Sequence, residues 1–159
     1  MSEPACPGCG LEGGPADGPT HPYMLSSPRC WQLYTELLAT APMGQKGIDA
    51  YAVQHPGVPE RRAIQSVGAH LVSLCAAFEH DWPPAGATDL VKRAVEASPG
   101  WVWLDSSPPV GTITVDDVIA EPDLPSRLAA VDSWARDVWA AYSDHHATVR
   151  SWLEQILGD

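Results

Sequence analysis

The C-terminal part of the chain most constrains what this sequence can fold into. Residues of one stripe recur every three or four positions there without a break: Leu128, Val131, Ala135, Val138, Tyr142, His145, Val149, Trp152 and Ile156. This spacing predicts an amphipathic α-helix from about Leu124 to Leu157, as one long helix or as two joined near Ser143 and Asp144. A helix of this kind has to bury its apolar stripe against other elements, so it belongs in a bundle.

Shorter helices are predicted upstream, separated by turn residues. Apolar residues at helical spacing mark residues 29–38, 48–52, 59–79 and 88–95. Pro56 ends the second of these helices, because the residue before a proline avoids helical angles, and Thr88 is suited to cap the fourth. Residues 101–104 are predicted to be extended or a packed loop, and residues 116–120 to form one helical turn. The prediction is a mainly α fold, a small helical bundle with an N-terminal zinc-binding loop.

Composition narrows the class of protein. A chain of 159 residues with 45% hydrophobic residues and seven tryptophans is long and apolar enough to bury a core as a single domain, 1–159. The net charge of −11 disfavours nucleic acid and anionic membrane surfaces as partners, since both attract clustered Lys and Arg. The sequence has neither a secretory pattern nor a run of apolar residues long enough for a membrane span, which predicts a cytoplasmic location.

The N-terminal segment 1–28 is rich in glycine, proline and cysteine, and it is predicted to be a metal-type loop in front of the bundle of residues 29–159. It contains the run Cys6-Pro7-Gly8-Cys9-Gly10. Proline and glycine suit a tight turn that turns backbone amides toward two thiolates. Two cysteines at this spacing are half of a tetrahedral zinc site, so Zn²⁺ is the predicted cofactor.

Three other residues are candidates for the remaining ligands. His21 is the preferred third ligand, and the fourth is His55, Cys30 or a water molecule, with His55 favoured over Cys30. His55 stands beside Pro56 at a helix end, whereas Cys30 could be a small buried apolar side chain. Four protein ligands would make the site structural, while three plus a water would leave a position open for catalysis.

Several blocks resemble an uncharacterised bacterial family, domain-of-unknown-function family 5946. They are Cys6–Gly10, Asp17–Tyr23, Cys30-Trp31, Asp49–Pro56, Gln65–Leu71 and His145–Trp152. The resemblance implies no established activity. It implies that some members carry Cys where this chain has His21, an exchange that a zinc ligand tolerates.

A second polar site is predicted inside the bundle. His70 lies at the edge of one apolar stripe, and His145 and His146 lie on the last one. With Asp49, Tyr51 and Gln54 they could line a pocket in which His70 or His146 transfers protons. The alternative is a structural role, in which each histidine is a hydrogen-bonded residue at the edge of the core.

Three functions stay open at this point. The first is a zinc-binding helical protein whose metal clips the N-terminal loop onto the bundle, beside a His-lined pocket for a small-molecule ligand. The second is a zinc-dependent enzyme with an open metal position that activates water or a small substrate. The third is a non-catalytic adapter or regulator that uses an acidic helical face. The sequence leaves the oligomeric state open.

Overall fold

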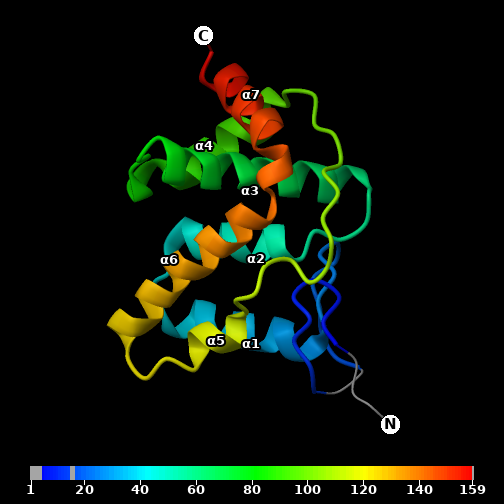
Figure 1. Cartoon of the computed structure of the whole chain (residues 1–159), viewed down its shortest axis with the longest axis vertical. Coiled ribbons are helices and arrows are strands. Elements are labelled where there is room, and N and C mark those ends of the chain that lie inside the picture. The colour runs from blue at the N-terminus through cyan, green and yellow to red at the C-terminus, as the bar shows by residue number, and fades with distance from the viewer. Residues whose placement is uncertain (1–4, 15–16, 159) are drawn as a thin grey trace.

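Helices account for all of the regular secondary structure in residues 5–14 and 17–158, the part of the chain that the computed structural model describes (Figure 1). The mainly α fold predicted from the sequence is thereby confirmed. The elements are α1 (Pro28–Thr40), α2 (Gly44–Gln54), α3 (Arg61–Glu79), α4 (Pro84–Ala97), α5 (Val115–Ile119), α6 (Leu124–Ala141), the 3₁₀ turn η1 (Ser143–His145) and α7 (His146–Leu157).

Helices α2 and α3 form the centre of the bundle. Helix α2 packs on α3 and α6, α3 also packs on α4 and α7, and α1 packs on α5 (Figure 1). Trp134 of α6 is completely buried and donates a hydrogen bond from its indole nitrogen to the Gln54 side chain over 3.0 Å. The Tyr142 hydroxyl donates to the backbone oxygen of Val53 over 2.9 Å. These bonds fix the register of α6 on α2, because buried polar atoms need partners.

Two boundaries refine the sequence prediction. Helix α4 begins at Pro84, not at Thr88, and Thr88 lies inside it. Proline suits the first helical position, where its missing N–H would have no helical partner, so the helix starts one turn earlier. The C-terminal stripe forms two helices, α6 and α7, interrupted at residues 143–145 as one of the two alternatives anticipated.

The N-terminal loop lies against the segment between α4 and α5 (Figure 1). The Val110 amide donates to the Gly8 oxygen over 2.9 Å, and the loop closes on itself through a 2.8 Å bond from the Cys6 amide to the Leu11 oxygen. Within the predicted loop of residues 1–28, residues 1–4 and 15–16 lie outside the described part. Among the described helices, none has both the length and the apolar character to cross a bilayer.

Candidate metal centre and the neighbouring cavity

Four buried side chains meet where the N-terminal loop reaches the bundle. Cys6, Cys9, Cys30 and His55 each offer one donor atom, and these four atoms all lie within 4.8 Å of one another. We call this group the Cys3His centre. Its members come from three separate parts of the chain, so only the tertiary fold brings them together.

Local structure explains how each donor is positioned. Cys6 and Cys9 stand on one turn, closed by a 2.9 Å bond from the Gly10 amide to the Cys6 oxygen. Cys30 lies in the first turn of α1, and its amide donates to the side chain of Ser27, the residue that caps the helix. His55 follows the last residue of α2, which ends there because the next residue is proline.

The imidazole of His55 is oriented for coordination. Its Nδ1 lies 2.8 Å from the Tyr51 backbone oxygen, a contact that requires the N–H to be on Nδ1. Its Nε2 then carries the lone pair and lies 3.3 Å from the sulfur of Cys30. The Tyr51 ring stacks on the imidazole with ring centroids 4.0 Å apart. Metal-bound histidines characteristically use their second nitrogen in this way.

Two of the donor separations are close to those of a tetrahedral site. Zinc–sulfur and zinc–nitrogen bonds of ordinary length place two sulfurs about 3.8 Å apart, and a sulfur and a nitrogen about 3.6 Å apart. The Cys9 and Cys30 sulfurs lie 3.7 Å apart, and the Cys30 sulfur lies 3.3 Å from the His55 nitrogen. The amide of Ser27 also donates toward the Cys6 sulfur over 3.4 Å. The group could therefore hold a metal ion.

The three sulfurs cannot all ionise by themselves. Hydrogen bonds from Cys30 and Cys9 lower the pKa of the Cys6 thiol, whereas the hydrogen bond to Cys6 is the largest factor that raises the pKa of Cys30. One thiolate is thus stabilised by its neighbours at the expense of the next. A divalent cation at the centre removes this conflict, because it favours the deprotonated form of every thiol that it contacts.

The centre is closed to solvent. Cys6 and Cys9 are 3% and 6% exposed, and Cys30 and His55 are 0% exposed. Gly8 lies directly against it, since a side-chain carbon there would come 2.5 Å from the Gln54 oxygen and 2.6 Å from the His55 ring. Glycine is therefore required in this turn for the loop to approach the end of α2.

His21, the preferred third ligand in the sequence analysis, lies outside the centre. Cys30, there the alternative fourth ligand, belongs to the centre together with His55. The His21 Nδ1 accepts from the backbone amides of Tyr23 and Met24 over 3.2 and 3.3 Å. Its ring contacts those of Tyr23 and Trp31 edge-on. The sequence contained a signal that bears on Cys30. A capping serine followed by proline, Ser27-Pro28, predicts a helix start, and this places Cys30 in the first turn of that helix.

Asp49 forms a second buried polar group in the middle of α2. Its side chain is almost inaccessible, with 1% of the residue exposed, and it accepts three hydrogen bonds. The donors are Ser73 at 2.5 Å, His70 Nδ1 at 2.6 Å and Gln45 at 2.8 Å. We call these four residues the Asp49 cluster. Both carboxylate oxygens therefore have partners within the protein, Oδ1 with Gln45 and His70 and Oδ2 with Ser73.

The other residues predicted for this pocket have partners elsewhere. Gln54 donates to the oxygens of Val110 and Ile113, in addition to accepting from Trp134.

The His145 Nε2 lies 2.8 Å from the Asp105 oxygen. His146 stacks on Trp139 and lies 2.9 Å from its backbone oxygen. Tyr51 packs between Tyr34 and His55 beside the Cys3His centre. The structure thus pairs His70 with Asp49 and places His145 and His146 against other partners.

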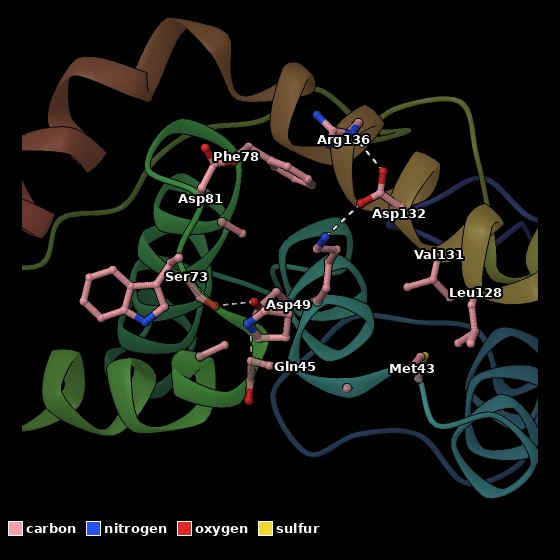
Figure 2. A pocket seen from close by; sticks show the side chains of 16 residues that line it. Met43, Gln45, Asp49, Ser73, Phe78, Asp81, Leu128, Val131, Asp132 and Arg136 are labelled. Carbon is pink, nitrogen blue, oxygen red and sulfur yellow. Dashed lines mark hydrogen bonds and ion pairs between the residues drawn. The ribbon is translucent and has the colours of Figure 1, made fainter.

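A cavity of about 530 Å³ opens beside the Asp49 cluster (Figure 2). Residues of α2, α3, α6 and the start of α4 line it. Asp49, Gln45 and Ser73 lie on one side of it, and Asp132 and Arg136 of α6 lie on another (Figure 2). This volume is in the range of small-molecule sites. Sequence periodicity had no means of detecting it, because the same stripes of apolar residues describe a cavity wall and a packed core.

One protein family matches most of the chain. The family described as a family of unknown function, DUF5946, matches residues 4–143. The chain belongs to the DUF5946 family. The DUF5946 match includes the whole Cys3His centre and the Asp49 cluster, and it ends before α7, so the block His145–Trp152 lies beyond it. No curated protein and no solved structure matches the chain significantly.

Proposed function

We propose that this protein is a zinc-stabilised helical scaffold that binds a small molecule. Cys6, Cys9, Cys30 and His55 hold one Zn²⁺ ion, which clips the N-terminal loop onto α1 and α2. The cavity beside the Asp49 cluster is the ligand site. The observation that carries the proposal is the closed group of four buried donor atoms within 4.8 Å of one another.

The donor set supports zinc in a structural role. Three thiolates and one imidazole are soft or borderline ligands, and a Cys3His set is typical of structural zinc. Catalytic zinc keeps one position for water, whereas here the protein supplies four donors and each is nearly or fully buried. A reducing cytoplasm, the location predicted from the sequence, would keep these thiols available for metal.

The position of the ion supports the clip. The centre joins the loop that carries Cys6 and Cys9, the first turn of α1 and the end of α2. Within the described residues this loop has no regular secondary structure of its own before Pro28. A metal ion adds bonds to the few hydrogen bonds that hold this loop, and its removal weakens the attachment of the loop to both helices.

A second candidate function, an enzyme, is favoured by one observation, the 2.6 Å contact between His70 Nδ1 and Asp49. Asp49 would position the imidazole so that Nε2 faces a groove of about 200 Å³, lined also by Tyr23, Arg62 and Ser66. His70 would then be a proton-transfer group. Nitrogen chemical shifts of His70 test the arrangement: Nδ1 protonated in the neutral ring supports it, and Nε2 protonated contradicts it.

Elemental analysis of the purified protein tests the main proposal. We expect about one zinc per chain in the unmodified protein and in the His21→Ala and Cys75→Ala variants, and little or none in Cys30→Ser. Cys75 is the matched control, because it is a buried cysteine of α3 outside the centre.

Two results would contradict the proposal. Zinc retained by Cys30→Ser but lost in His21→Ala would restore the ligand set favoured by the sequence. Zinc absent from the unmodified protein, even after purification and refolding with the metal, would remove the centre as a metal site.

A further inference from the structure

Two cations share one carboxylate at the α6 side of the cavity. The Lys46 ammonium lies 2.8 Å from one oxygen of Asp132, and the Arg136 Nε lies 2.8 Å from the other (Figure 2). The hydrogen bond from Lys46 and that from Arg136 lower the pKa of Asp132, so this carboxyl group is ionised at neutral pH. The trio therefore carries one uncompensated positive charge, in a protein with a net charge of −11.

Both cations keep hydrogen-bond donors to spare. An ammonium has three N–H bonds and a guanidinium has five, and each uses one in its contact with Asp132. The Phe78 ring lies beside both groups, with the Lys46 ammonium 5.2 Å and the Arg136 guanidinium 4.5 Å from its centroid. A cation held over an aromatic ring loses little further entropy when it binds an anion.

The carboxylates on the other side of the cavity have little capacity left to bind a ligand. Asp49 already accepts three hydrogen bonds and is almost completely buried, so a ligand ammonium would have to displace one of its partners. Asp81 is exposed to solvent at the edge of the cavity. Water and salt weaken attraction to exposed charges, and this applies both to Asp81 and to Arg136, whose side chain is 61% exposed. The carboxylates that line the cavity outnumber its two cations, but the hydrogen-bonding capacity left over there is that of N–H donors, which suits an anionic head group.

Apolar side chains stand next to the cations. Met43, Leu128 and Val131 line the cavity on the same side as Asp132, and Leu128 is 37% exposed (Figure 2). An exposed leucine beside a cavity gains free energy when a hydrocarbon group covers it. The cavity therefore combines an anion-binding end with an apolar wall.

We propose that the cavity binds a small amphipathic carboxylate. Its carboxylate group accepts hydrogen bonds from Lys46 and Arg136, and its hydrocarbon part lies against Met43, Leu128 and Val131. This inference rests on the assignment of the cavity as the ligand site and is independent of the metal that the Cys3His centre holds.

Calorimetric titration of the zinc-loaded protein with three eight-carbon probes tests the proposal. We expect octanoate to bind at least about 10-fold more tightly than octanol or octylamine, because only octanoate carries the matching charge. Lys46→Met and Arg136→Met should each weaken octanoate binding about 10-fold and leave octanol binding within about 2-fold. Lys92→Met is the matched control, an exposed lysine of α4 outside the cavity wall.

A further variant, Leu128→Trp, narrows the cavity and should weaken both octanoate and octanol. Zinc content and Tm of every variant, measured on the same samples, exclude unfolding as the cause.

Octylamine binding as tightly as octanoate would overturn the ligand class while leaving the cavity as a site. Octanoate binding that none of the three cavity variants changes would overturn its location. Failure of all three probes would overturn both the inference and the ligand site, whereas the zinc centre is judged by metal content alone.

Discussion

The Cys3His centre and the Asp49 cluster are two buried polar groups on the same helix, and they are completed in opposite ways. Asp49 lies in the middle of α2 and receives three hydrogen bonds from Gln45, His70 and Ser73. His55 lies just past the end of α2 and meets three thiols that compete for protons. The first group is satisfied by the protein, and the second is one that could hold a metal ion.

This difference shows what a buried polar group implies. Burial alone identifies neither a metal site nor a ligand site, because buried polar atoms are usually paired. The informative property is the number of donors or acceptors left over after the protein's own pairs are made. By that measure the Cys3His centre points to a metal, and the Lys46–Asp132–Arg136 trio, with spare N–H donors, points to an anion.

Metal removal should separate the two groups most strongly. If zinc holds the N-terminal loop as proposed, a strong chelator at neutral pH should lower Tm by at least about 10 °C. Added zinc should restore the original value, as measured by scanning calorimetry. Cys30→Ser is the control and should already show the lower Tm without responding to the chelator. A metal-free protein with unchanged Tm would contradict a structural role.

Removing the carboxylate of the second group should cost less, and without loss of metal. Asp49→Ala leaves the donors of Gln45, His70 and Ser73 without their acceptor, so we expect the free energy of unfolding to fall by about 2–4 kcal/mol. Urea denaturation measures the change, and zinc content should stay at one per chain. Asp89→Ala, at an exposed site of α4, should change the free energy by less than about 0.5 kcal/mol. Loss of zinc in Asp49→Ala would mean that the two groups are coupled.

A smaller steric change should affect only the metal centre. Gly8→Ala places a methyl group against the Gln54 oxygen and the His55 ring, so the turn has to move away from α2. We expect the free energy of unfolding to fall by about 1–3 kcal/mol and zinc to exchange faster with a colorimetric chelator. Pro7→Ala, an exposed residue of the same turn, is the matched control. Equal exchange rates in the two variants would show that the close approach of Gly8 is unimportant.

The weakest effect is expected from a pair of charged groups at the surface. The hydrogen bond from Arg150 lowers the pKa of Glu79, so the folded protein binds that proton less readily than the unfolded chain. The pair therefore stabilises the fold above the unfolded pKa of glutamate, about 4.3, and this contribution is lost as pH falls through the lower folded pKa.

We expect Arg150→Met to lower Tm by about 2 °C or less at pH 7, because exposed ion pairs contribute little, and to have a smaller effect at pH 3 than at pH 7. Thermal denaturation at the two pH values measures this. A larger decrease at low pH than at pH 7 would reverse the sign of the argument.

The sequence by itself determined most of the secondary structure. Periodic apolar residues and the prolines and glycines between them predicted the helices, because helix formation depends on neighbours three and four residues apart. It also determined that Cys6 and Cys9 stand on one turn and that α2 ends before Pro56. These are short-range properties of the backbone.

Only the tertiary structure decided which residues meet. His21 is close to Cys9 in sequence, yet neighbouring backbone amides use its Nδ1, while Cys30 reaches the centre because α1 begins at Pro28 and packs beside the end of α2. The pairing of Asp49 with His70, and the cavity next to it, likewise depend on how α2 lies across α3. Such contacts join residues far apart in the chain, and a one-dimensional pattern carries no information on the distance between two helix faces.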